Sequence, residues 1–123
     1  MNKTTVLIVE DEAIIDADIS NKLGRLGFEV IGTAARGEEA IDLACRLLPQ
    51  VVLMDIRLKS AMNGIEAAEA IRRQHCAPVI FMSAHSDSAT LEQAKLSEPI
   101  GFILKPFKES ELAITIKIAL HKR

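Results

Sequence analysis

Residues 51–55 read Val-Val-Leu-Met-Asp. Its four apolar residues show no polar alternation, which is typical of a strand covered on both faces by helices. Short apolar runs of the same kind recur along the chain at 6–9, 30–31, 79–82 and 101–104. Residues 51–54 would therefore be the third of five strands.

Segments with helical spacing of apolar residues separate these runs. In the first, Ile15, Ile19, Leu23 and Leu26 share one helical stripe, and Gly27 closes it. The later helices are expected at 37–48, from 64 through 71, around 91–94 with Pro99 as the stop, and from about 108 to 121. A strict alternation of strand and helix with short connections predicts a doubly wound α/β fold, with a parallel five-stranded sheet and helices on both faces.

Length and composition suit one soluble globular domain, which we place at residues 1–123. Hydrophobic residues make up 49% and charged residues 26% of the chain, which excludes a disordered or membrane-embedded protein. The net charge of −2 and the 3% aromatic content argue against a nucleic-acid or membrane surface. No signal peptide or membrane-spanning segment is expected, and the cytoplasm is the predicted location.

The two cysteines, Cys45 and Cys76, stand apart from any Cys-x-x-Cys or Cys/His cluster. A zinc site or a thioredoxin-type centre is therefore not expected. Free cysteine is among the most buried side chains, so both are predicted to be small core residues in a reducing environment.

Polar residues end four of the expected strands. Glu10 and Asp11 follow the first strand, Asp55 the third, Ser83 the fourth and Lys105 the fifth. Taken one by one, each has an ordinary interpretation as a helix cap, a dipole partner or a turn residue. In a parallel α/β sheet, however, ligands bind outside the carboxyl ends of the strands, so the joint placement indicates a site.

The residue types at this edge favour phosphoryl transfer. Carboxylates about 4 Å apart repel each other by roughly 1–4 kcal/mol, and a divalent cation would offset that cost. Carboxylate oxygens suit Mg²⁺, which also binds phosphate oxygens. Asp55 would supply the nucleophilic oxygen, the Glu10/Asp11 pair the metal ligands, and Lys105 and Ser83 a cation and a hydroxyl for the phosphoryl group.

With these residues in place, the sequence resembles the receiver domain of two-component response regulators over nearly its whole length. Four segments carry the resemblance, namely Val-Leu-Ile-Val-Glu-Asp-Glu at 6–12, Val-Val-Leu-Met-Asp-Ile at 51–56, Pro-Val-Ile-Phe-Met-Ser-Ala at 78–84 and Phe-Ile-Leu-Lys-Pro-Phe at 102–107. The resemblance implies a single-domain, flavodoxin-like (βα)5 fold. It also implies a cis Lys105–Pro106 bond.

The resemblance further implies a signalling role for a phosphoprotein. Asp55 would accept a phosphoryl group from a sensor histidine kinase or a histidine phosphotransfer protein. Glu10, Asp11, Asp55 and the backbone carbonyl of Arg57 would bind Mg²⁺, while Ser83 and Lys105 would hold the phosphoryl oxygens. Such a domain catalyses its own phosphorylation and dephosphorylation, and it switches the surface of the fourth helix, fifth strand and fifth helix toward an output domain or protein.

Three departures from the family pattern are visible. Phe102 stands where the family often has Tyr, so an aromatic switch with Ser83 could act by packing but not through a phenol hydroxyl. Glu10 rather than Asp begins the acid pair, which lengthens the reach to a metal. The loop at 56–63 carries Lys59 and Ser60 in place of a frequent proline.

Three other functions are compatible with this fold class. A flavodoxin would need a Ser/Thr/Gly-rich phosphate loop after the first strand, where acids stand instead. An aspartyl-phosphate phosphohydrolase would carry an acid where Arg57 lies. A receiver-like interaction module without phosphotransfer is the remaining alternative, and the complete set of acids, Ser83 and Lys105 argues against it. The chain could act alone or belong to a longer regulator or a hybrid kinase.

Two further sets of residues follow from position alone. Arg57 and His85 lie two residues beyond Asp55 and Ser83, so both are predicted to tune the lifetime of the phosphoryl group. On the last helix, Ile114 and Ile118 lie one turn apart, facing away from the expected core residues Leu112 and Ile116. This second apolar stripe predicts a partner surface, used with Phe102 and the fourth helix for homodimerisation or output.

Overall fold

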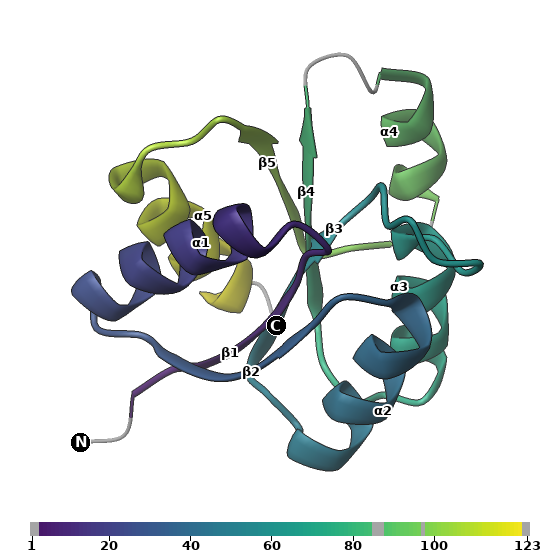
Figure 1. Cartoon of the computed structure of the whole chain (residues 1–123), viewed down its shortest axis with the longest axis horizontal. Helices are drawn as coiled ribbons and strands as arrows, with labels where there is room; N and C mark the ends of the chain where they lie inside the picture. Colours follow the sequence, from purple (N-terminus) through teal and green to yellow (C-terminus); the bar gives the residue numbers. More distant parts are fainter. Residues whose placement is uncertain (1–2, 85–87, 97, 122–123) are drawn as a thin grey trace.

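The computed structural model describes residues 3–84, 88–96 and 98–121. In this part of the chain, five parallel strands form one sheet in the order β2-β1-β3-β4-β5, as Figure 1 shows. The strands are β1 (Thr5–Val9), β2 (Glu29–Ala34), β3 (Val51–Asp55), β4 (Val79–Ala84) and β5 (Gly101–Lys105). β3 is the central strand, so the sequence 51–55 lies at the middle of the sheet. The predicted doubly wound parallel fold is confirmed.

Helices cover both faces of the sheet. They are α1 (Ala13–Arg25), α2 (Gly37–Leu47), α3 (Gly64–Arg73), α4 (Ser88–Lys95) and α5 (Glu109–His121). In Figure 1, α1 and α5 lie on one side of the sheet and α2, α3 and α4 on the other. No helix in the described part of the chain is long and apolar enough to span a membrane.

The sheet separates two apolar cores because successive strand residues point to opposite faces. In β1, Val6 and Ile8 join the core under α1 and α5, whereas Leu7 and Val9 join the core under α2 and α3. All four are fully buried. A strand that is apolar at every position is therefore what a sheet covered on both faces requires.

Local chemistry explains how α3 begins beside the central strand. Asn63 accepts a hydrogen bond from the backbone N–H of Glu66, whose carboxylate in turn accepts from the backbone N–H of Asn63. Gly64 then packs against the strand, since a β-carbon added there would lie only 2.1 Å from the carbonyl oxygen of Asp55. The sequence Asn63-Gly64 thus starts the helix and brings it against the end of β3.

Several element boundaries differ from the sequence-based prediction. β4 extends one residue beyond the predicted end at Ser83, to Ala84, whereas β5 ends at Lys105. β2 is also longer than predicted, starting at Glu29 and ending at Ala34. Its half-exposed residues explain the weak apolar signal, because β2 is an edge strand. The Lys105–Pro106 bond is cis, as predicted.

The prediction for the cysteines is wrong. Cys45 in the last turns of α2 and Cys76 in the connection from α3 to β4 form a disulfide, with their Cα atoms 4.9 Å apart. Both are half-buried rather than core residues, and neither is a free thiol. The 31-residue separation conceals this contact, because only the packing of α2 beside α3 brings the two residues together.

Candidate functional site

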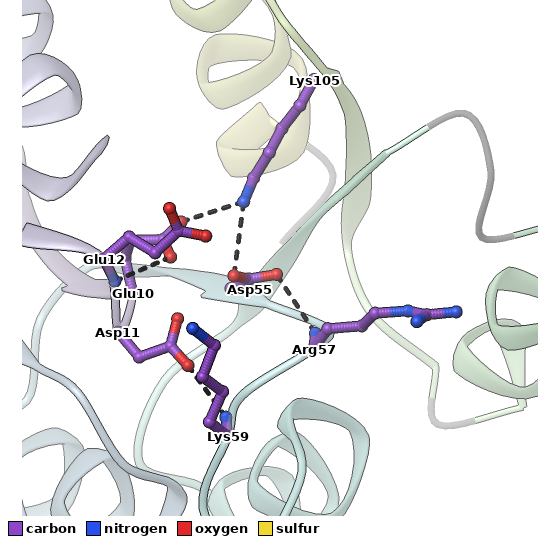
Figure 2. Close-up of polar contacts among 7 residues, drawn as sticks. All are labelled: Glu10, Asp11, Glu12, Asp55, Arg57, Lys59 and Lys105. Atoms are coloured by element: carbon purple, nitrogen blue, oxygen red, sulfur yellow. Dashed lines mark hydrogen bonds and ion pairs between the residues drawn. The ribbon is translucent and has the colours of Figure 1, made fainter. Parts of the chain in front are cut away.

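The polar residues predicted at the strand ends converge at the carboxyl edge of the sheet. Figure 2 shows Lys105 reaching from β5 toward Glu10 and Asp55, with Asp11 beside them. Oxygen atoms of Glu10, Asp11 and Asp55 all lie within 4.8 Å of one another. The topology that makes β1 and β3 neighbours therefore brings together three carboxylates that lie on two distant segments of the chain.

Two of these carboxylates are buried polar groups. Glu10 is 4% exposed and Asp55 is 7% exposed, whereas Asp11 is partly exposed. Burial of unpaired carboxylates is costly, because the charged form loses its hydration. The site must therefore supply positive charge or protons to both groups.

Lys105 supplies that positive charge. Its Nζ lies 2.9 Å from Glu10 Oε1 and 3.3 Å from Asp55 Oδ2. Glu10 also accepts a hydrogen bond from the backbone N–H of Glu12, and Asp55 Oδ1 accepts one from the backbone N–H of Arg57 at 3.1 Å. One ammonium group is thus shared between two buried carboxylates.

The electrostatics of this group shift two pKa values. Burial raises the pKa of Asp55 from 3.8 to about 7, with Lys105 lowering it and Glu10 raising it further. Burial lowers the pKa of Lys105, but the hydrogen bond and charge of Glu10 and the charge of Asp55 more than offset this, so the net pKa is raised. Lys105 therefore stays charged, while the pKa of Asp55 lies near neutral pH.

The loop that follows β3 contributes a contact that the sequence did not reveal. The backbone N–H of Lys59 donates to Asp11 Oδ2 at 2.9 Å, and Figure 2 shows the Lys59 side chain pointing back toward the acids. A backbone amide carries no sequence signature, so only the fold could identify this interaction. The Lys59 contact orients the most exposed of the three carboxylates.

Ser83 lies near the end of β4, next to Ala84, which lines the cavity at the site. It is 2% exposed, and its Oγ has no hydrogen-bond partner within residues 3–84, 88–96 and 98–121. A buried hydroxyl without a partner costs roughly 1–3 kcal/mol, which a ligand oxygen would recover. A cavity of about 360 Å³ opens nearby, and its lining includes Asp11, Asp55, Ala84 and Lys105.

Arg57 and His85 are the two residues predicted to tune the lifetime of the phosphoryl group. Arg57 lines the same cavity, but Figure 2 shows its guanidinium extending away from Asp55. His85 lies outside the described residues. The lifetime-tuning role of both residues stays a prediction.

The residues predicted to form a switch and partner surface lie around β5, an edge strand of the sheet. Phe102 is half-buried and packs against Phe81 with ring centroids 6.0 Å apart. Ile114 and Ile118 are 57% and 52% exposed, as the helical spacing predicted, while Leu112 is buried. Phe102 and Ile118 line one hollow of about 320 Å³ between β5 and α5.

The donor set at the strand ends fits a hard divalent cation. The group offers three carboxylates whose oxygens are close enough to share one ion, and oxygen ligands are what Mg²⁺ prefers. Asp11 is partly exposed, which gives an ion and its remaining water ligands access from the cavity. The cation would also replace part of the charge that Lys105 supplies.

Comparison with known proteins gives a consistent family. Residues 6–117 match the model of the response regulator receiver domain. The transcriptional regulatory protein PdtaR of Mycobacterium tuberculosis is 35% identical over 95% of this chain and 57% of its own length. The positive alginate biosynthesis regulatory protein of Pseudomonas aeruginosa is 36% identical over 93% of this chain and 46% of its own length. The chain thus spans about half the length of these relatives.

Solved structures agree with this result. The signal receiver domain of a modulated diguanylate cyclase from Desulfovibrio desulfuricans G20 superposes with a TM-score of 0.91 at 36% identity, covering 98% of this chain and 96% of that one. The receiver domain of the response regulator NarL from Mycobacterium tuberculosis gives 0.91 at 27% identity, with full coverage of both chains. From the family match, these structures and the convergent strand-end residues, the chain belongs to the response regulator receiver domain family.

Proposed function

We propose that this chain is a phosphoacceptor signalling domain in which Asp55 takes a phosphoryl group from a phosphohistidine on a sensor kinase or histidine phosphotransfer protein. The observation that carries the proposal is the convergence of Asp55 with Glu10, Asp11 and Lys105 at the carboxyl edge of the sheet. Each group has a distinct use in phosphoryl transfer. Family membership supports the same function.

The chemical step uses the carboxylate of Asp55. One Asp55 oxygen attacks phosphorus as the bond from phosphorus to the donor's imidazole nitrogen breaks, and that nitrogen takes up a proton. Lys105 and Ser83 would then bind the phosphoryl oxygens, because one offers a charged donor at 3.3 Å from Asp55 and the other an unpartnered buried hydroxyl. Hydrolysis by water would return phosphate and the free carboxylate.

The metal would be held by Glu10, Asp11, Asp55 and the backbone carbonyl of Arg57. When bound, Mg²⁺ supplies positive charge for the charge that develops on the transferring phosphoryl oxygens. Before that, Lys105 keeps Glu10 and Asp55 paired, so that the empty site remains folded.

The surroundings of the site support a protein as the phosphodonor. An apolar cavity of about 400 Å³ lies between α1 and the segment that follows β5, and its lining includes Ile15, Ile19 and Phe107. Ala84 and Lys105 line both this cavity and the one next to Asp55. A donor helix seated there would present its phosphohistidine next to Asp55. This arrangement favours a kinase or a phosphotransfer protein, rather than a small molecule, as the donor.

The output surface is proposed to be the face of α4, β5 and α5. Phe102 lines the same hollow as Ile118, so a change of packing around Ser83 and Phe102 would reach the exposed Ile114 and Ile118. An output domain or a second copy of the chain would bind there.

Phosphorylation by a small acyl phosphate tests the proposal. Mass mapping is expected to find a single modified residue, Asp55, and labelling is expected to stop in the presence of a metal chelator. The variant Asp55→Asn removes the acceptor, and Asp42→Asn, on the exposed face of α2, serves as its matched control. Label that persists in Asp55→Asn or resists the chelator would contradict the assignment and favour a plain interaction module.

Asp11→Ala separates the metal role from a structural role. Because Asp11 is the most exposed of the three carboxylates, its removal is expected to weaken Mg²⁺ binding, measured by calorimetry, much more than it changes the melting temperature. Relief of repulsion between the acids should offset the lost contact with Lys59. A loss of stability that matches the loss of binding would instead indicate a capping role.

A further inference from the structure

Helices α2 and α3 are joined at both of their ends, and the two junctions differ in kind. At their C-terminal ends, the disulfide between Cys45 and Cys76 connects α2 to the segment that follows α3. At their N-terminal ends, both helices contact the loop that follows Asp55. The chain enclosed by the disulfide contains the whole of β3, this loop and α3.

The contacts at the N-terminal ends are close. The backbone N–H of Gly37 at the start of α2 donates to Ser60 Oγ at 3.2 Å, and a β-carbon added at Gly37 would lie 3.0 Å from Met62 Cβ. At the start of α3, the backbone N–H of Gly64 donates to the carbonyl of Ile56 at 3.1 Å. The loop 56–63 is thus held between two helices whose far ends are covalently linked.

The disulfide itself is placed where a reductant can reach it. Both cysteines are half-buried, and the neighbouring Arg46 and His75 are exposed. Cys76 packs against the apolar core that includes Ala44 and Ile71, but neither cysteine is among its buried residues, so the packing of those buried residues would remain when the bond is reduced. In a cytoplasmic protein, a disulfide of this kind is more often redox-sensing than structural.

We propose that Cys45 and Cys76 form a reversible redox site that responds to cellular dithiols. Through α2 and α3, the state of this site would change how firmly the loop 56–63 is held. This proposal rests on the proposed function for its effect on the loop and for the cytoplasmic setting, but not for the chemistry of the bond. The oxidised form holds the two helices in one arrangement. The reduced form leaves only noncovalent packing between their C-terminal ends.

The redox step balances with a dithiol as the reductant. One thiolate of the dithiol attacks the sulfur of Cys45 or Cys76, the Sγ–Sγ bond breaks, and the leaving sulfur takes up a proton. The second thiolate of the dithiol then resolves the mixed disulfide. Two electrons pass to the protein, which gains two thiols, and the dithiol becomes a disulfide. Oxidised glutathione would reverse the reaction in two exchange steps.

Two consequences are expected when the bond is reduced. The unfolded chain gains freedom over a 31-residue loop, so the melting temperature should fall by about 10 °C. The loop 56–63 loses part of its support, and with it the backbone N–H of Lys59 that orients Asp11. The affinity for Mg²⁺ should therefore fall by about two- to fivefold, because only one of the proposed ligands, Asp11, becomes less well oriented.

The experiment compares the oxidised protein, the same protein reduced by a dithiol, and the variant Cys45→Ser/Cys76→Ser. Thiol alkylation followed by mass spectrometry counts the free cysteines, and the melting temperature and the Mg²⁺ affinity are measured on each sample. We expect no alkylation before reduction, two alkylated cysteines after it, and recovery of the original melting temperature with oxidised glutathione. The double variant should behave as the reduced protein does and ignore the dithiol.

Each contrary result has a defined meaning. Two free thiols that persist after treatment with oxidised glutathione would overturn the redox site. A melting temperature that responds to the dithiol while the Mg²⁺ affinity stays constant would overturn the coupling to the loop. If the double variant fails to fold, the reduced parent protein provides the same comparison. Failure of Asp55 to be phosphorylated in both redox states would overturn the proposed function and leave the thiol measurements unaffected.

Discussion

Lys105 Nζ lies 2.9 Å from Glu10 Oε1, across 95 residues of sequence, and the Glu10 side chain is fully buried. The same ammonium reaches Asp55 Oδ2 at 3.3 Å. Lys105 therefore occupies, in the metal-free protein, the electrostatic role that a divalent cation would share. A divalent cation bound at the site would therefore compete with Lys105 for Glu10 and Asp55.

The first prediction concerns Lys105→Gln. Loss of the ammonium leaves Glu10 and Asp55 without their shared counter-ion, so the metal-free variant should lose about 2–4 kcal/mol of unfolding free energy. Mg²⁺ should bind more tightly, by about threefold or more, since a nearby positive charge is gone. Chemical denaturation and calorimetry check both effects. Lys108→Gln, which removes an exposed lysine, is the control, and an unchanged Mg²⁺ affinity would contradict the competition.

A second prediction follows from the pKa of Asp55, which burial raises from 3.8 to about 7. Because the folded protein binds this proton more tightly than the unfolded chain, Asp55 favours folding at low pH, and that contribution is lost as the pH rises from about 4 through 7. Each pKa unit corresponds to about 1.4 kcal/mol, which sets an upper bound of roughly 4 kcal/mol.

Asp55→Asn removes this dependence. Without metal, the variant should match the parent protein near pH 4 and exceed its unfolding free energy by a few kcal/mol at pH 8. Asparagine keeps an acceptor for the backbone N–H of Arg57, so the local hydrogen bond is retained. Denaturation curves across this pH range provide the measurement. A difference between the two proteins that does not change with pH would show that Asp55 is not the titrating group.

The sequence predicted most of the fold because hydrophobic periodicity is a local property. The apolar runs at 51–54 and 79–82 predicted buried strands, and the Asn63-Gly64 pair predicted the start of a helix. Edge positions were predicted less well. In β2 the half-exposed residues at 30–32 give little apolar contrast, so the strand was predicted too short.

The candidate site was predictable to the extent that strand-end positions determine it. Asp55 and Lys105 were identified because parallel strands place their last residues at one edge. The amide of Lys59 on Asp11 was missed because backbone groups leave no trace in the sequence. The bond between Cys45 and Cys76 was missed because it depends on how two helices pack, which residue spacing does not report.

A third prediction tests the contact between Gly64 and Asp55. A β-carbon at Gly64 would lie 2.1 Å from the Asp55 carbonyl oxygen, which is backbone and cannot move aside cheaply. Gly64→Ala should therefore lower the unfolding free energy by about 3 kcal/mol or more. Gly24→Ala is the matched control, because Gly24 lies in α1 with nothing within 4 Å of the added carbon. That substitution should stabilise the protein by about 0.5–1 kcal/mol, and similar losses in both variants would contradict the steric argument.

The lifetime of the phosphorylated form provides a fourth prediction. Arg57 lines the cavity next to Asp55, and a hydrolytic water that entered through this cavity would pass it. Arg57→Ala and His85→Ala are expected to change the decay rate of phosphorylated protein, measured after removal of the phosphodonor. Arg72→Ala, remote from the site in the last turn of α3, is the control. If both substitutions leave the rate unchanged, these side chains are bystanders in hydrolysis.

The last prediction concerns the apolar stripe of α5. Ile114 and Ile118 are 57% and 52% exposed, and Ile118 shares a hollow with Phe102. The two isoleucines lie one helical turn apart, and Ile118 adjoins Phe102, the residue proposed as the switch. Such an apolar surface fits one that a second copy or an output protein covers on phosphorylation. Sedimentation with and without a phosphoryl mimic should show self-association of the parent protein, and Ile114→Glu/Ile118→Glu should abolish it. Ile14→Glu, at an exposed isoleucine of α1, should leave it intact, whereas a parent protein that stays monomeric in both states excludes the dimer.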